Sequence, residues 1–268
     1  MDQGAVIDEA PVRPATGLQG RPDGPAARAP AEPPALSLRH LEVMRGRRKV
    51  LHDISLDVPD GTITGLVGLN GAGKTSLIKA VLGLAGETGG EIRIFGEPAE
   101  AMRRRGAIAC LPEQFRPPGQ LRGRAYVRLM RGLETDPASA GDALAVAASL
   151  DLDPVALDRP IRTWSKGMCQ KLGLAVTLAG CARLLVLDEP MSGLDPRARA
   201  LLKTCLQRAR DEGRTLLVCS HILADLDEIA DRIAVIHDGR LVAAGTTDEL
   251  RGHHPTLEQS FLDLIGPA

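Results

Sequence analysis

Hydrophobic and polar residues alternate over some stretches of the chain and recur with helical spacing over others. Alternation, and short apolar runs bounded by turn residues, predict strands at residues 36–44, 49–58, 62–68, 91–95, 107–110, 184–187, 215–219, 233–236 and 240–244. Apolar residues three and four apart predict helices at 74–84, 165–178, 197–212, 224–230 and 257–265, and a mostly helical stretch at 120–152.

The order of these elements predicts the fold class. Strands and helices alternate from residue 184 onward, which is typical of an α/β domain with a largely parallel sheet. The helical block in the middle interrupts that alternation and predicts an inserted α-helical subdomain at about 112–170. We therefore expect one main domain at 36–250 and a helical tail at 251–268.

Residues 1–35 differ from the rest of the chain. They contain seven of the 19 prolines and four glycines, with almost no hydrophobic periodicity. This composition predicts a disordered extension, with a Pro-rich binding motif as the alternative.

Composition excludes several classes of protein. Lys and Arg total 33 and Asp and Glu 34, so the net charge of −1 argues against a protein held on nucleic acid mainly by phosphate contacts. No apolar run approaches 18 residues, and the first residues lack an apolar signal segment. The five cysteines form no C-x-x-C pair, which argues against a disulfide framework or a zinc site and favours a reducing cytosol.

The strongest chemical signal follows the predicted strand 62–68. It fits G-x-x-x-x-G-K-[ST], the phosphate-binding P-loop, and is made of Gly68, Leu69, Asn70, Gly71, Ala72, Gly73, Lys74, Thr75 and the following Ser76. Glycines let the backbone N–H groups approach phosphate, and the next helix begins with its positive dipole end there. We expect Lys74 to contact the outer phosphates and the Thr75 hydroxyl to bind Mg²⁺.

A second chemical signal lies at the end of the apolar strand 184–187. Asp188 and Glu189 follow it directly. In P-loop proteins an acid at such a strand end holds Mg²⁺, and we assign this role to Asp188. Glu189 would then lie beside the γ-phosphate and polarise the attacking water as a general base.

Three further motifs narrow the class of nucleoside triphosphatase. Residues 164–168 read Trp-Ser-Lys-Gly-Met, residues 192–195 read Ser-Gly-Leu-Asp, and Ser220-His221 follow the strand at 215–219. With the P-loop and the two acids, their order and spacing resemble the ATP-binding cassette (ABC) proteins over residues from about 36 to 265. The resemblance implies a P-loop core with an antiparallel β-subdomain beside the inserted helices.

The resemblance also implies a mechanism. Two cassettes, identical or different, pack head to tail around two ATP molecules. Ser165 and Gly167 would bind the γ-phosphate of the partner's ATP, and Ser165 would also cap its helix. His221 would bind the γ-phosphate within its own chain, and Asp195 would help to couple the two sites.

ATP hydrolysis in this family drives transport through a separate integral membrane permease, which usually contacts the helical block. The chain would then be peripheral, at the cytoplasmic face of the membrane. The Leu-Pro-Glu sequence at 111–113 and the Ser-Lys-Gly-Met sequence resemble the drug- and copper-exporting branch. The alternative is a soluble ABC ATPase of translation or DNA repair, but the chain has one cassette and no heptad run. A P-loop kinase or GTPase would have no use for the three added motifs.

Two positions depart from the family pattern. The aromatic residue that usually stacks on adenine is replaced by Arg45 or Met44, so base selectivity is expected to be loose. The usual glutamine after the strand 107–110 corresponds to Glu113, with Gln114 next to it, and either side chain could reach Mg²⁺ and the attacking water.

Overall fold

The structure is a computed structural model that describes residues 33–266, apart from residues 87 and 139. The predicted disordered extension therefore lies outside the described residues as far as residue 32. The described part begins with ordered contacts, because Ala35 is buried and its carbonyl accepts a hydrogen bond from the backbone N–H of Phe95 at 3.1 Å. The first strand then starts at Leu36, as expected.

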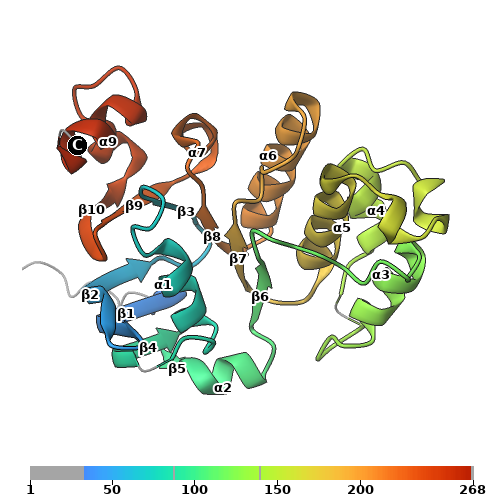
Figure 1. Ribbon diagram of the computed structural model, residues 1–268, viewed down its shortest axis with the longest axis horizontal. Coiled ribbons are helices and arrows are strands. Elements are labelled where there is room, and N and C mark those ends of the chain that lie inside the picture. The colour runs from blue at the N-terminus through green and yellow to red at the C-terminus, as the bar shows by residue number, and fades with distance from the viewer. Residues whose placement is uncertain (1–32, 87, 139, 267–268) are drawn as a thin grey trace, which may run out of the picture. The chain divides into compact units, whose positions relative to one another are not determined.

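Two sheets organise the described residues (Figure 1). The smaller has the order β2-β1-β4-β5 and is antiparallel; its strands are β1 (Leu36–Arg45), β2 (Arg48–Val58), β4 (Thr88–Ile94) and β5 (Glu97–Pro98). The larger has the order β10-β9-β3-β8-β7-β6, with strands β3 (Ile63–Val67), β6 (Ile108–Leu111), β7 (Leu184–Asp188), β8 (Thr215–Cys219), β9 (Arg232–His237) and β10 (Arg240–Thr246). All its neighbouring pairs are parallel except β9 with β10.

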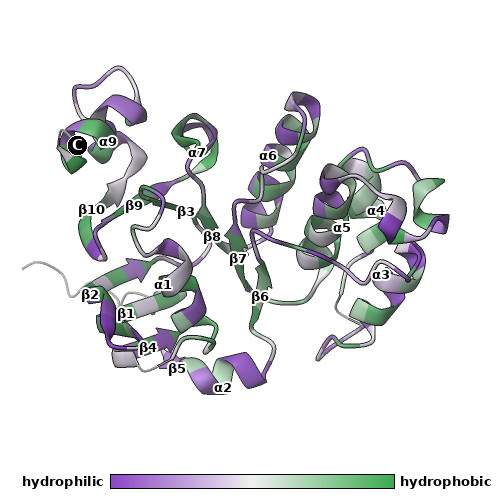
Figure 2. Cartoon of the chain, viewed as in Figure 1, coloured by the Kyte–Doolittle hydropathy of each residue, from purple (hydrophilic) through white to green (hydrophobic). Residues whose placement is uncertain are grey.

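The central strands are apolar on both faces, which is typical of parallel strands covered on two sides. In β7, Leu184 and Val186 belong to one hydrophobic cluster, whereas Leu185 and Leu187 belong to another. Figure 2 shows these strands as mostly hydrophobic along their length. Apolar side chains on both faces of a strand are removed from water only if other elements pack on both faces of the sheet.

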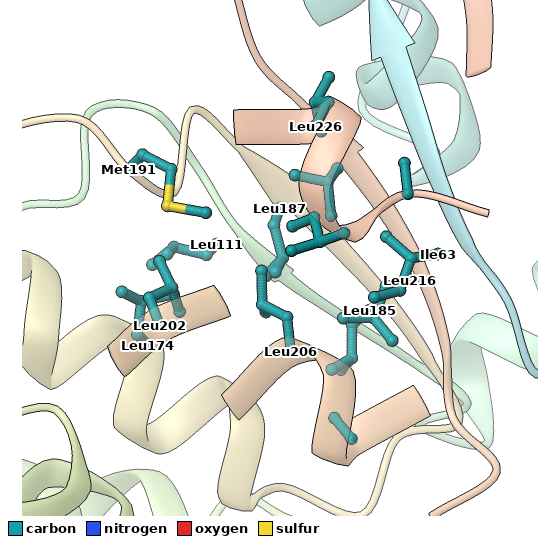
Figure 3. Close-up of a cluster of buried hydrophobic side chains, with 14 of the residues drawn as sticks. Ile63, Leu111, Leu174, Leu185, Leu187, Met191, Leu202, Leu206, Leu216 and Leu226 are labelled. Atoms are coloured by element: carbon teal, nitrogen blue, oxygen red, sulfur yellow. The ribbon is translucent and has the colours of Figure 1, made fainter. Parts of the chain in front are cut away.

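Different elements cover the two faces. One cluster joins β7 and β8 to α5 (Lys166–Ala179), α6 (Pro196–Asp211) and α7 (Leu223–Ile229); Figure 3 shows Leu174, Leu202 and Leu226 converging on Leu185 and Leu187. The tail helix α9 (Leu257–Ile265) joins the same cluster. The other cluster joins the opposite face to α1 (Lys74–Val81) and to the antiparallel sheet.

A third cluster holds the predicted helical subdomain. It contains residues of α3 (Gly123–Arg131), α4 (Ala143–Ser149) and two 3₁₀ turns at Ala156–Asp158 and Ile161–Thr163. Tyr126 packs edge-on against Phe115 with ring centroids 6.0 Å apart. One face of α5, which includes Leu172 and Ala175, also belongs to this cluster, so α5 joins the helical layer to the central sheet.

The predicted α/β class, with a largely parallel sheet and an antiparallel β-sheet beside it, is confirmed. Several boundaries were wrong: the helix predicted at 74–84 ends at Val81, and the strand predicted at 91–95 spans Thr88–Ile94. The sequence reasoning missed β5, α2 (Ala99–Arg104) and α8 (Thr247–Arg251). These elements have two to six residues, too few to show a period. No helix within 33–266 is long and apolar enough to cross a membrane.

Candidate nucleotide site

A cleft of about 860 Å³ lies at the carboxyl ends of the parallel strands, where open α/β sheets place their ligands. Six segments line it: the β1–β2 hairpin, the β3–α1 loop, the three segments after β6, β7 and β8, and the β9–β10 turn. The lining residues are Arg45, Arg48, Lys49, Val50, His52, Asn70, Gly71, Gly73, Lys74, Thr75, Ser76, Glu113, Asp188, Glu189, Ser192, His221, Asp238 and Gly239.

The β3–α1 loop has the geometry of an anion cradle. Gly73 precedes α1 with φ of 113°, a conformation that side chains rarely allow, and among the described residues no side chain caps the first N–H groups of the helix. Those N–H groups and the helix dipole favour an anion. Lys74 is only 8% exposed, and its Nζ donates to the carbonyls of Gly68 and Leu69 at 2.7 and 3.2 Å. Its charge is therefore held at the loop where the outer phosphates are expected.

Neighbouring backbone fixes the position of this loop. The N–H of Gly239, in the β9–β10 turn, donates to the carbonyl of Ala72 at 2.9 Å, and the Gly239 carbonyl accepts from the N–H of His52 at 2.8 Å. The loop is thereby tied to both sheets. Ala72 is buried and Leu69 is about half exposed, and neither lines the cleft; they serve the loop's shape.

Asp188, at 5% exposure, is more deeply buried than the other carboxylates that line the cleft. Its pKa is raised to about 6, mainly by burial and further by the nearby charges of Glu113 and Glu189, whereas Lys74 and a hydrogen bond from Thr75 act in the opposite direction. Ionised Asp188 thus lacks full compensation within the protein. A carboxylate beside a hydroxyl is a donor set that suits a hard divalent cation.

Glu189 and His221 meet at the same end of the cleft. Oε2 of Glu189 lies 2.8 Å from Nδ1 of His221, although the residues belong to segments after different strands. Glu189 has a positive φ of 51°, and its N–H donates to the carbonyl of Cys219 at 2.9 Å. Backbone strain of this kind is characteristic of functional positions. The turn aims the carboxylate into the cleft, and the exposed imidazole covers it.

At two positions the sequence left a choice between neighbouring residues, and the structure places the two candidates of each pair differently. Glu113 lines the cleft and influences the pKa of Asp188, whereas Gln114 does not line it. Arg45 lines the cleft, whereas Met44 lines only a smaller adjoining hollow.

The remaining predicted residues lie together, but outside the lining of this cleft. Ser165 caps α5 by accepting from the N–H of Met168 at 3.2 Å, and Asp195 caps α6 by accepting from Ala198 at 2.9 Å. The Ala198 hydrogen bond also lowers the pKa of Asp195. A Cβ on Gly167 would lie 2.7 Å from the carbonyl oxygen of Gly193, so the two motifs touch through bare backbone.

Two residues in or just after the Trp-Ser-Lys-Gly-Met segment make connections to which the sequence reasoning assigned no role. Lys166 Nζ donates to Oγ of Ser192, a lining residue, at 3.0 Å. Gln170 is buried on α5, and its Nε2 donates to the carbonyl of Pro190 at 3.2 Å, just after Glu189. Their role depends on how α5 packs against the turn after β7, and no local pattern signals it.

Comparison with known proteins agrees with this geometry. The model of the ABC transporter family matches residues 51–192. The lantibiotic transport ATP-binding protein SrtF of Streptococcus pyogenes is 31% identical over 77% of this chain and 89% of its own length. The daunorubicin/doxorubicin resistance ATP-binding protein DrrA of Streptomyces peucetius is 36% identical over 79% of this chain and 64% of its own length.

A solved structure is also similar to this chain. The ATP-binding subunit of an ABC transporter superposes with a TM-score of 0.75 and 29% identity, covering 87% of this chain and all of that one. The chain spans less than two thirds of the length of several curated relatives.

Proposed function

Because the chain belongs to the ABC transporter family, we propose that it binds and hydrolyses ATP to drive transport, in the export direction, through a separate membrane permease. The observation that carries this proposal is the meeting of Lys74, Asp188, Glu189 and His221 in one cleft beside an uncapped helix N-terminus. The names of SrtF and DrrA, which refer to lantibiotic transport and drug resistance, support export.

Each residue has a role that follows from its position. The N–H groups at the start of α1 and Lys74 bind and orient the phosphates. Glu189 accepts a proton from the attacking water, and His221 holds the Glu189 carboxylate in place through the 2.8 Å contact. Thr75 and Asp188 fit Mg²⁺, which would neutralise phosphate charge when bound.

The second half of the site comes from another cassette. Ser165, Gly167 and Asp195 do not line the cleft of their own chain. They are placed at the ends of α5 and α6, where helix N-termini favour an anion. We assign these ends to the γ-phosphate bound by a partner cassette, so that ATP joins two chains and hydrolysis separates them. The chain would then lie at the cytoplasmic face of the membrane, attached to its permease.

Replacing Glu189 by Gln tests the proposal. The variant keeps the shape of the side chain but loses the base, so phosphate release should fall by about 100-fold or more while ATP affinity is unchanged. ATP with Mg²⁺ should also convert the variant to a stable dimer on size-exclusion chromatography. Turnover at the wild-type rate would refute the base assignment, and absence of ATP binding by the wild type would refute the function itself.

A further inference from the structure

Glu189, the proposed base, lies on a strained backbone that its surroundings must hold. Its φ of 51° is positive, and such a conformation persists at a residue with a side chain only where neighbouring groups fix it. On one side, its N–H donates to the carbonyl of Cys219, in β8, at 2.9 Å. On the other side, its carbonyl accepts from the N–H of Ser192 at 3.0 Å. Ser192 therefore closes the turn that holds the base.

Two side chains from one face of α5 fasten this turn. Lys166 and Gln170 are four residues apart in the helix, so they lie on the same face. Nζ of Lys166 donates to Oγ of Ser192 at 3.0 Å, and Nε2 of Gln170 donates to the carbonyl of Pro190 at 3.2 Å. The position of the turn that carries Glu189 is thus tied to the position of α5.

Lys166 occupies a place where a lysine is otherwise unfavourable. It is the first residue of α5, and a positive charge at a helix N-terminus opposes the helix dipole. Its aliphatic stem lies over the bare backbone of Gly193, because a Cβ on that glycine would be 3.3 Å from Cγ and 3.2 Å from Cδ of Lys166. The stem therefore crosses Gly193 and brings the ammonium group to Ser192. This contact accounts for a lysine at an unfavourable position.

We propose that Lys166 is a positioning residue for hydrolysis, whose hydrogen bond to Ser192 fixes the turn from which Glu189 reaches the attacking water. The proposal rests on the function proposed above and adds a residue to it. Lys166 lies between Ser165 and Gly167, which we assigned to the partner's γ-phosphate. The position of the base in one chain therefore depends on the ATP that the other chain binds. A displaced base slows the chemical step and leaves phosphate binding at the start of α1 unchanged.

Lys166→Met tests the proposal, because methionine keeps an unbranched stem over Gly193 but cannot donate a hydrogen bond. The kcat of phosphate release should fall about tenfold, which corresponds to one hydrogen bond to a charged group. The dissociation constant of ATP, measured by calorimetry in the Glu189→Gln background to prevent turnover, should change by less than about twofold. Lys166 is exposed, so thermal unfolding of the variant should match that of the wild type.

Lys166→Arg and Arg162→Met complete this comparison. Arginine keeps a charged donor on a long stem, so Lys166→Arg should recover most of the lost kcat. Arg162→Met is the matched control, since Arg162 is exposed just before α5 and does not line the cleft. It removes a positive charge close to Lys166 and should hydrolyse ATP like the wild type. Equal losses in Lys166→Met and Arg162→Met would overturn the proposal.

Ser192→Ala separates the positioning role from direct binding of phosphate by Lys166. It removes the acceptor, so kcat should again fall about tenfold, and the double variant with Lys166→Met should be no slower than either single variant. Multiplied losses in the double variant would mean that Lys166 acts elsewhere, and would overturn the proposal. In the Glu189→Gln background, Lys166→Met should still form the ATP-dependent dimer. Loss of that dimer would assign Lys166 to the partner's phosphate and would also overturn the proposal.

Failure of this inference differs from failure of the function on which it depends. A wild type that does not bind ATP would overturn both. Turnover of Glu189→Gln at the wild-type rate would also overturn both, because there would be no base at Glu189 to position. A wild type that hydrolyses ATP through Glu189, and that keeps its kcat in Lys166→Met, would overturn only the inference.

Discussion

Asp188 is the residue whose ionisation most opposes folding in the cleft. Its pKa in the folded chain is raised to about 6 from 3.8, so the folded state holds this proton more tightly than the unfolded state. The stabilisation from that proton is complete below about pH 4 and is lost as the pH rises through 6. At pH 8 without Mg²⁺, Asp188→Asn should therefore be more stable than the wild type by about 3 kcal/mol.

Urea unfolding of the wild type and of Asp188→Asn at pH 5 and pH 8 measures this difference. We expect it to shrink by about half at pH 5, because the folded wild type is then mostly protonated while the unfolded carboxyl is still mostly ionised. Glu258→Gln, at an exposed position on α9, is the control and should show no such change. A variant advantage that is equal at both pH values would mean that burial of charge is not the cause.

The cleft residues that could be predicted from the sequence are those that lie next to one another in short motifs. The loop from Gly68 to Thr75 and the acids after β7 are contiguous motifs, so the sequence could identify them. The position expected to contact adenine could only be narrowed to Arg45 or Met44, because the β1–β2 register shifts between Val43 and Met44 and counting along the chain then fails. The contact between Glu189 and His221 joins two segments 32 residues apart, and it depends on the packing of β7 against β8.

At the scale of elements, the start of α5 and the start of α6 behave as one unit. Gly167 approaches Gly193 so closely that a Cβ would lie 2.7 Å from the carbonyl oxygen. Gly167→Ala should push the two helix ends apart. We expect a loss of stability of about 1–3 kcal/mol and a large fall in ATP hydrolysis, with ATP affinity of the isolated chain nearly unchanged.

Gly132→Ala is the matched control for this variant. Gly132 lies in the same helical layer, has a helical φ of −69°, and has room for a Cβ. Phosphate release and thermal unfolding of both variants give the comparison. If Gly167→Ala hydrolysed ATP like the wild type, close backbone contact between the two motifs would not be required.

Long helices and strongly apolar strands could be predicted from the sequence, whereas several short elements could not. The strands β7 and β8 are apolar runs that are buried along their length, and the period of α6 continues over 16 residues. By contrast, α8 contains five residues, but Thr246 and Glu249 form a complete capping box that could have revealed it. The start of β4 was missed because it contains Gly89 and Gly90, which have low strand propensity.

At the scale of the whole molecule, charge is unevenly distributed although the net charge is only −1. Residues 114–133 contain no Asp or Glu, but they include five arginines: Arg116, Arg122, Arg124, Arg128 and Arg131. This segment includes α3 of the helical layer. A permease that contacts this layer meets a positive surface, so its attachment should depend on salt.

Capture of the tagged chain from detergent-solubilised membranes of its native host measures that attachment. We expect a polytopic membrane protein in stoichiometric yield at low salt, and a lower yield as salt increases. Arg128→Glu should reduce the yield severalfold, because charge reversal at a contact surface repels the partner. Arg208→Glu is the matched control, since Arg208 is exposed on α6 and, in the part of the chain that the structure describes, forms an ion pair with Glu212 alone. Recovery of ribosomal or DNA-repair proteins, with no membrane protein, would instead identify a soluble ABC ATPase and end the transporter assignment.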